Sequence, residues 1–425
     1  MPRQLVRNHL VRRQLLRGVA AAGLAVMLAA VAGCSATPTP TPTPSPTPTP
    51  TGDGVLTIGT LFPSSGGVTF IGPAQVAGVN AAVREINAAG GVNGQPVVVV
   101  NRDSGDATSQ LAEESFAALV AAKVDVIIGP SSSVLAQRLL KPAADAGIPL
   151  ISPAATFPQL TVLDTAGIFS RTIASYPHQA IVLADVFAQK NVKSVALVYG
   201  DDALGTSLSA ALVSSLDAAG IDLTAIKVTK DSDAAKIAAD VKAAAPDAVV
   251  LATLDNGDQT KALITQLSAA DFGGAKLWLT TQNLADYSQA LPAGLLNTAN
   301  GILDGASPDA GFQAKVKAED PGVIDFHYAA EAYDATILAA LAAELAHDDG
   351  GASISRELQA ASVGGIKCTS FGECLDVLTT QSDIDYDGVS GSVNLDENGD
   401  VVRGTYGIVV YNGENKYSLV STRVG

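Results

Sequence analysis

Residues 124–156, VDVIIGPSSSVLAQRLLKPAADAGIPLISPAAT, hold a complete strand-helix-strand unit. The apolar run at 124–128 predicts a buried strand, the stretch 134–146 predicts an amphipathic helix, and 149–152 predicts a second strand. Strands that alternate with helices in this way form parallel sheets joined by right-handed crossovers. The unit therefore indicates a doubly wound sheet, whose ligands bind at the loops that follow the carboxyl ends of the strands.

The same alternation of β-branched runs and Ala-rich amphipathic segments occurs in two series. One series extends over residues 56–152 and the other over 194–280. A long helix is expected at 326–346, followed by a hairpin with strands at 401–410 and 417–421. The predicted fold class is α/β, with two doubly wound parallel-sheet lobes.

Length and charge limit the functions that remain. The 425 residues exceed what one core usually organises, and 47% hydrophobic against 16% charged residues exclude general disorder. Five of the 26 Lys and Arg residues precede residue 34, which leaves 21 basic against 42 acidic residues and a charge of −21. Such a surface repels phosphate backbones and anionic lipid headgroups, so we expect no nucleic-acid partner.

The first 33 residues predict a secretory signal. They combine an Arg-rich, acid-free start with the small apolar run 18–32, and Val31-Ala32-Gly33-Cys34 resembles a bacterial lipobox, whose cysteine is acylated. The Arg12-Arg13 pair leaves the general and the twin-arginine export routes both open. Residues 34–53 are expected to be a linker, because prolines at every second position prevent helix and sheet formation. Glycosylation of this Thr/Pro-rich linker also stays open.

Two cysteines remain in the exported chain. Cys368 and Cys374 are separated by five residues, and an oxidising compartment favours a disulfide between them. The alternative is a pair of metal ligands. It is the weaker one, because His178, His327 and His347 have no ligand spacing to the cysteines or to one another. We therefore expect a disulfide and no metal site.

Five segments occur together in an order that points to one family. They are LTIG at 56–59, EINAAGGVNG at 85–94, IGPSSS at 128–133, PLISPAAT at 149–156 and YDGVSG at 386–391. In this order, over residues 54 to about 420, the chain resembles the branched-chain amino acid-binding (Leu/Ile/Val-binding-like) family of ABC-transporter substrate-binding lipoproteins. The resemblance implies a type I periplasmic-binding fold, in which two lobes joined by a three-segment hinge close on a solute. Lobe 1 would comprise 54–173 and 303–386, and lobe 2 would comprise 174–302 and 387–425.

The resemblance also implies a solute site in the loops of lobe 1. The hydroxyls of Ser133 and Thr156 would hold a carboxylate, and the carbonyl of Ala154 would take an ammonium group. A hydroxyl beside free N–H groups at a helix start suits a carboxylate on physical grounds as well. Ser133 is expected to be the N-cap of its helix in addition.

Lobe 2 departs from the family pattern. Leu204 stands about where the family has an aromatic residue, and Gln282 stands near the position of an acidic partner for the ammonium group. Asp202 or Asp255 could replace that carboxylate. The solute is therefore left open between an amino acid and an amide, urea-like or other small polar compound.

These observations predict a monomeric, extracytoplasmic solute-binding receptor that presents a small polar solute to an ABC-type permease. Acylated Cys34 would be its only contact with the membrane and would anchor it to the outer face. We expect no cofactor and no catalytic residue, because Gly-x-Gly-x-x-Gly and Gly-x-Ser-x-Gly motifs are missing and no base accompanies the serines at 131–133. The alternative is a ligand-sensing lipoprotein that reports a bound solute to a membrane signalling partner.

Overall fold

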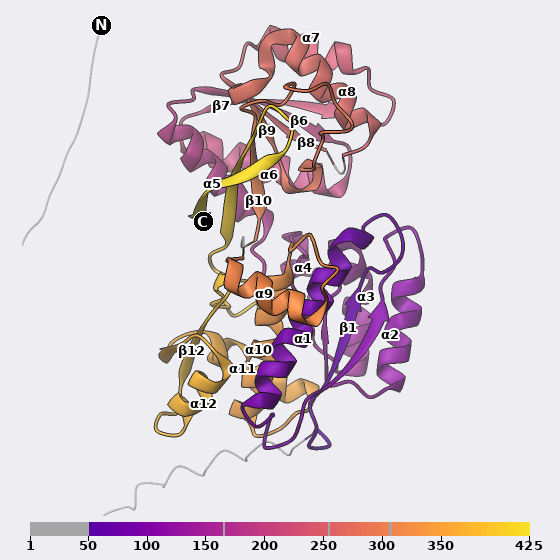
Figure 1. The fold of residues 1–425 in the computed structure, drawn as a ribbon, viewed down its shortest axis with the longest axis vertical. Coiled ribbons are helices and arrows are strands. Elements are labelled where there is room, and N and C mark those ends of the chain that lie inside the picture. The colour runs from indigo at the N-terminus through magenta and orange to yellow at the C-terminus, as the bar shows by residue number, and fades with distance from the viewer. Residues whose placement is uncertain (1–50, 165, 254–255, 306–307) are drawn as a thin grey trace, which may run out of the picture. The chain divides into compact units, whose positions relative to one another are not determined.

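The computed structural model describes residues 51–164, 166–253, 256–305 and 308–425 (Figure 1). The expected signal segment, Cys34 and almost all of the linker lie outside the described residues, as does Asp255. In the described part of the chain, no helix combines the length and the apolar character needed to cross a bilayer.

The first sheet has five parallel strands in the order β2-β1-β3-β4-β5. They are β1 (Thr57–Phe62), β2 (Val98–Asp103), β3 (Val126–Ile128), β4 (Leu150–Ser152) and β5 (Phe169–Arg171). The helices between them are α1 (Gly72–Ala88), α2 (Leu111–Ala121), α3 (Ser133–Ala146) and the short α4 (Gln159–Leu163). The interior strand β1 is buried along almost its whole length, as expected for a strand with helices on both faces.

The second sheet has seven strands in the order β15-β14-β10-β9-β8-β6-β7. They are β6 (Ser194–Gly200), β7 (Asp222–Val228), β8 (Ala248–Ala252), β9 (Leu277–Leu279), β10 (Asn300–Asp304), β14 (Thr405–Tyr411) and β15 (Tyr417–Val424). Its helices are α5 (Tyr176–Gln189), α6 (Ala203–Ala218), α7 (Ala234–Ala244) and α8 (Asp258–Leu267). Short 3-10 turns lie at Thr69–Ile71, Gly274–Lys276 and Thr281–Asn283, and a π turn follows α8 at Ser268–Phe272.

The terminal hairpin makes this second sheet mixed. Strands β7, β6, β8, β9 and β10 are parallel, whereas β14 runs antiparallel to β10 and pairs with β15. The hairpin predicted from the sequence is therefore present, and it extends the sheet next to β10. This pairing places Tyr406 directly opposite Asp304, a contact between residues about one hundred positions apart.

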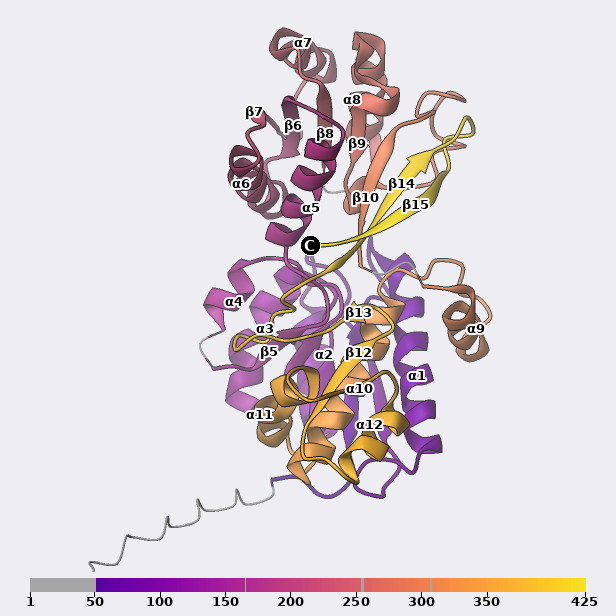
Figure 2. The same cartoon turned by 90° about the vertical axis from the view of Figure 1, so that its left-hand side faces the viewer.

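After β10 the chain returns to the helices of the first sheet (Figure 2). The elements of this return are α9 (Ala310–Glu319), α10 (Ala329–Ala346), α11 (Gly351–Ser362), β11 (Ile366–Cys368), α12 (Phe371–Leu378), β12 (Ile384–Gly388) and β13 (Gly391–Ser392). Helix α10 is buried on nearly all sides and packs against α1 and α11. A Cβ atom on Gly78 of α1 would lie 2.3 Å from the carbonyl oxygen of Ala329, so glycine permits the close approach of α1 and α10.

The lobe boundaries stay a prediction, but the packing suggests a refinement of the last one. Val393, Leu395 and Val401 are buried in the same apolar cluster as residues of α1 and α10. The strand β14 that belongs to the second sheet begins only at Thr405. A division near residue 402 would therefore suit this packing better than the division at 386 expected from the sequence.

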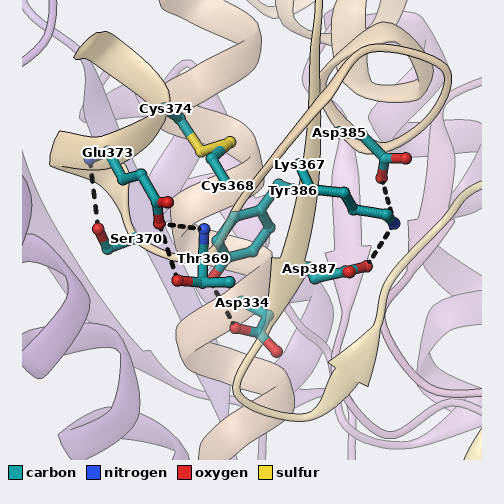
Figure 3. Close-up of a disulfide and its surroundings, with 10 residues drawn as sticks. All are labelled: Asp334, Lys367, Cys368, Thr369, Ser370, Glu373, Cys374, Asp385, Tyr386 and Asp387. Atoms are coloured by element: carbon teal, nitrogen blue, oxygen red, sulfur yellow. Dashed lines mark hydrogen bonds and ion pairs between the residues drawn. A yellow bond between two sulfur atoms is a disulfide. The ribbon is translucent and has the colours of Figure 1, made fainter. Parts of the chain in front are cut away.

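A disulfide closes the loop between β11 and α12 (Figure 3). It joins Cys368 and Cys374, the pair expected from the sequence, and both cysteines are buried. Beside it the Tyr386 hydroxyl donates a hydrogen bond of 2.8 Å to the buried carboxylate of Asp334. The disulfide ties β11 to α12, and the hydrogen bond ties β12 of the same small sheet to helix α10.

Candidate functional site

The loops after β3 and β4 meet at the hydroxyl of Ser133. This residue is the first of α3, and its Oγ accepts hydrogen bonds from the backbone N–H groups of Thr156 at 3.0 Å and Phe157 at 3.2 Å. Ser133 and Thr156 are both buried. Because Oγ is the acceptor in both bonds, the hydroxyl proton of Ser133 can be donated to a further acceptor.

The helix cap differs from the sequence expectation. The N-cap of α3 is Ser132, whose extended backbone and Oγ, accepting from the N–H of Leu135, have the geometry of a cap. Ser133 already lies inside the helix, and its side chain turns toward the Thr156 loop. The expectation that Ser133 caps α3 was therefore wrong. A run of three serines in the sequence does not show which of them is the N-cap.

A buried arginine supports the loop at residues 154–157. The Arg171 guanidinium at the end of β5 donates to the carbonyls of Ala155 at 3.0 Å and Phe157 at 2.9 Å. Its Nε lies 2.6 Å from Oδ1 of Asp400, which belongs to the segment that leads to the terminal hairpin. Ala154 lies in the same loop, and its N–H donates to Ser152 Oγ at 3.3 Å. The loop is therefore fixed from two sides.

Tyr176 connects this loop to the second sheet. It is the first residue of α5, its N–H donates to the Thr156 carbonyl at 3.1 Å, and its hydroxyl accepts from Gln282 Nε2 at 3.1 Å. Burial raises the pKa of Tyr176, the charge of Asp304 raises it further, and contact with the Thr156 side chain opposes the rise. The structure thus brings Ser133, Thr156 and Gln282 together, with Tyr176 as the link that the sequence analysis missed. The available signal was an aromatic residue before Pro177 at a helix start that directly follows a short strand.

Asp202 lies at the start of the helix that follows β6 in the second sheet, and its role in binding stays a prediction. It is the N-cap of α6 and its Oδ1 accepts from the N–H of Gly205 at 2.9 Å. It also lines a hollow of about 440 Å³ at the carboxyl ends of β6, β7 and β8, together with Thr229 and Lys230. Leu204 lies in the first turn of the same helix.

A second hollow, of about 510 Å³, lies at the carboxyl ends of β1 and β2. Phe62, Asn101, Asp103 and Glu319 contribute to its lining. It contains none of the residues that the sequence singled out. Three of the predicted residues, Ser133, Thr156 and Gln282, are instead linked through Tyr176, so that cluster is the candidate solute site.

An acidic residue that the sequence analysis did not select lies next to Gln282. Asp304 ends strand β10, and its backbone N–H donates to the Thr281 hydroxyl at 2.7 Å. Burial raises the pKa of Asp304 to about 7, although contacts with the Gln179 and Thr281 side chains and the charge of His327 oppose the rise. The cluster therefore contains a carboxyl group whose ionised form is poorly solvated.

The chemistry of these groups suits binding. The cluster supplies hydroxyls, an amide and backbone N–H groups, and Ser131 donates to the amide oxygen of Gln75 at 2.7 Å rather than to a base. An amide cannot take a proton from serine, so this arrangement does not activate a nucleophile. Over the residues that the structure describes, no group of three or more His, Cys, Asp and Glu side chains could hold a metal ion.

The model of the Periplasmic binding protein family matches residues 55–375. The chain belongs to this family. This periplasmic binding protein is similar to the chemotactic signal transduction system substrate-binding protein BasB of Halobacterium salinarum. The two are 27% identical over 355 residues, which cover 80% of this chain and 83% of BasB. It is 32% identical over 168 residues to the Leu/Ile/Val-binding protein BraC3 of Rhizobium johnstonii, over 39% of this chain and 45% of that protein.

Solved structures support the type I periplasmic-binding fold. The branched-chain amino acid transporter substrate-binding protein LivJ of Streptococcus pneumoniae, in complex with isoleucine, has a TM-score of 0.67 at 22% identity and covers 87% of this chain and 99% of its own. A solute-binding protein of R. palustris in complex with benzoate has a TM-score of 0.62 at 20% identity, and the match covers 87% of this chain and 96% of that protein. The resemblance to the branched-chain amino acid-binding family is confirmed. These relatives and neighbours are solute-binding proteins, not enzymes.

Proposed function

We propose that this periplasmic binding protein is the extracytoplasmic receptor of an ABC-type importer and binds a small polar solute at Ser133, Thr156, Tyr176 and Gln282. The observation that carries the proposal is the Tyr176 hydroxyl, which accepts from Gln282 while the Tyr176 backbone is bonded to Thr156. Loops that follow strands of two different sheets thus meet at one polar group. Doubly wound sheets bind their ligands at such loops.

The loops of the first sheet suit a carboxylate. Ser133 has a proton to donate, and it lies in the first turn of α3, where the helix dipole favours negative charge. Thr156 adds a second buried hydroxyl. An amino acid or an amino-acid-like compound is the solute class that these groups fit.

Binding could be coupled to movement of the two sheets and their helices. Gln159 of α4 donates to Ser207 of α6 at 3.1 Å, so the helices of the two sheets already exchange a hydrogen bond. A solute that contacts both sets of loops stabilises the arrangement in which both are within reach. A permease can then distinguish the loaded receptor from the empty one.

The test is a thermal-shift screen of the purified full chain against all amino acids, their amides, urea, short carboxylates and benzoate. A solute that binds only the native state raises the melting temperature. We expect at least one hit, and we expect Thr156→Val and Tyr176→Phe to weaken its binding at least about tenfold, because each removes a hydrogen bond to a polar solute.

Tyr417→Phe is the matched control, because Tyr417 starts the edge strand β15 of the second sheet and packs against Tyr411, in a different apolar cluster from Tyr176. It should bind the hit as tightly as the wild type does. A screen without any hit would contradict the receptor proposal, and equal losses in all three variants would contradict the choice of site.

Sensing is the second candidate function. It is favoured by the similarity to BasB, which extends over 83% of that chemotactic substrate-binding protein. Deletion of the gene separates the two functions. An importer receptor should be needed for uptake of the radiolabelled hit, whereas a sensor should be needed for the behavioural or transcriptional response to the hit while uptake persists.

A further inference from the structure

Asp304 is a buried acid without a full set of partners. Only 3% of its surface is exposed. The Gln179 side chain donates to Oδ1, but Oδ2 has no hydrogen-bond partner among the residues that the structure describes. A buried carboxylate oxygen without a donor is costly, so such an oxygen is usually retained for a function.

Three tyrosines lie close enough to this carboxylate for its charge to act on them. Tyr406 lies opposite Asp304 in the sheet, and the charge of Asp304 acts on the hydroxyls of Tyr176, Tyr328 and Tyr406. Burial is the main reason that the pKa of each tyrosine is raised, and the charge of Asp304 comes next. Tyr328 has a φ of 60°, a left-handed conformation that is uncommon for a bulky residue and is found at functional sites.

Among the described residues no lysine or arginine balances Asp304, and the His327 side chain, whose charge opposes the rise in the pKa of Asp304, already pairs with Asp325. Every lysine and arginine after residue 34 lies in the described part of the chain, and none is within ion-pair distance of Asp304 there. The buried Arg171 is paired with Asp400. A second acid, Glu331, lies beside Gly305, the residue that follows Asp304. A Cβ atom on Gly305 would be 2.5 Å from Oε1 of Glu331.

A buried carboxylate that no lysine or arginine pairs with, close to aromatic side chains, is an environment in which a small organic cation is stabilised. We propose that Asp304 is the anionic contact of the solute site, so that the protein selects solutes with a cationic nitrogen over solutes that carry only a carboxylate. This inference rests on the proposed function and names the residue that takes the place of the acid missing at Gln282. Asp304 is bonded through its N–H to Thr281, the neighbour of Gln282.

Asp202 is less suited to this role. Its carboxylate already accepts from the N–H of Gly205 at the start of α6. The unpaired oxygen of Asp304 and the unpaired Oε1 of Gln179 are both acceptors, and an ammonium group would donate to both. The Tyr406 hydroxyl, which also has no partner among the described residues, is a third group that the cation can meet.

Calorimetry with matched probes tests the proposal on the full chain. The first probe is L-leucine. Two analogues of leucine are matched to it: 4-methylpentanoate lacks the amine of leucine, and 3-methylbutylamine lacks the carboxylate. The other amino acids and benzoate complete the set. The variant is Asp304→Asn. The control Asp145→Asn removes an equal charge at the surface, where Asp145 pairs with the exposed Lys141.

We expect the best amino acid to bind the wild type at least about 30-fold more tightly than its analogue without the amine. Asp304→Asn should lower the affinity for that amino acid by a similar factor, leave the affinity for the analogue within about threefold, and leave the melting temperature at or above that of the wild type. Asp145→Asn should bind like the wild type.

Two results would overturn the inference while leaving the receptor function intact. One is that 4-methylpentanoate or benzoate binds the wild type as tightly as any amine-bearing probe. The other is that Asp304→Asn, correctly folded by circular dichroism, keeps the wild-type affinity for the amino acid. If no probe binds the wild type, the proposed function itself fails and the inference fails with it.

Discussion

At the scale of single residues, the Arg171 guanidinium supports the loop that carries Thr156. Its side chain is 0% exposed, and it donates to two carbonyls of the loop as well as to Asp400 and Thr161. A buried arginine that meets a carboxylate and carbonyls at once leaves several groups unsatisfied when it is removed.

We therefore predict that Arg171→Met lowers the free energy of unfolding by about 3 to 5 kcal/mol, since the partly buried Asp400 would lose its counter-charge and the carbonyls of Ala155 and Phe157 would lose their donor. Urea denaturation at pH 7 measures it. The control is Arg356→Met, because Arg356 pairs with Glu357 at the surface, and its cost should stay within about 1 kcal/mol. Equal losses in the two variants would contradict the role given to Arg171.

Asp304 is expected to make the stability of the protein depend on pH. Its pKa is raised from 3.8 to about 7 in the folded protein. Between these values the folded state holds a proton that the unfolded state has lost, so the stability contributed by protonated Asp304 is full below pH 4 and is lost as the pH rises to about 7. Asp125 and Asp334, whose pKa values are also raised, act in the same direction.

The melting temperature of Asp304→Asn minus that of the wild type isolates this contribution. We expect the difference to grow from pH 4 to pH 7 and to level off above, with a free-energy equivalent of at most about 4 kcal/mol. Asp125 and Asp334 are present in both proteins, so their pH-dependent contributions to stability cancel in the difference between the two melting temperatures. A difference that is constant with pH would contradict the raised pKa of Asp304.

At the scale of elements, the contact of α1 with α10 depends on Gly78. A Cβ atom there would lie 2.3 Å from the Ala329 carbonyl oxygen, so Gly78→Ala must push two helices apart. We predict a loss of about 1 to 3 kcal/mol in urea denaturation. The same substitution at Gly372 of α12 is the control, because its Cβ would meet only Ala89 at an ordinary 3.9 Å, and a gain of up to about 1 kcal/mol is expected. A gain at both positions would contradict the close helix contact.

The elements with strong sequence patterns were predicted, and those with weak patterns were missed. Helix α3 and the strands β3 and β4 on either side of it lie within a few residues of the ranges predicted for them, 134–146, 124–128 and 149–152. Strand β5 has only three residues, and β10 contains Asn300 and Gly301, which are poor strand formers. Short or atypical strands offer too few residues for a period to be recognised.

The part of the site that the sequence analysis missed lies on these missed elements. Tyr176 follows β5 and Asp304 ends β10, whereas Ser133 and Thr156 follow strands that were recognised. Asp304 lies in the stretch LDGASPD, which reads as a solvated loop. Its burial depends on pairing with Tyr406 and on Gln179, and such long-range contacts leave no local pattern.

At the scale of the whole molecule, the proposed lipid anchor decides where the receptor works. We predict that the wild-type protein sediments with membranes and that Cys34→Ala is released, because acyl chains stabilise membrane binding by about 0.8 kcal/mol per buried methylene group. Fractionation and immunoblotting measure it, with Ser35→Ala as the control. A wild-type protein found only in the soluble fraction would contradict the anchor.

The buried disulfide has a practical consequence for measuring the receptor in solution. Because Cys368 and Cys374 are bonded to each other, the described residues offer no free thiol to a maleimide dye. A cysteine introduced at Val162, which is 79% exposed on α4, would be labelled alone once Cys34 is replaced. The dye would be attached three residues from Gln159, where α4 contacts Ser207 of α6, so its fluorescence would turn the receptor into a reagentless sensor for its own solute.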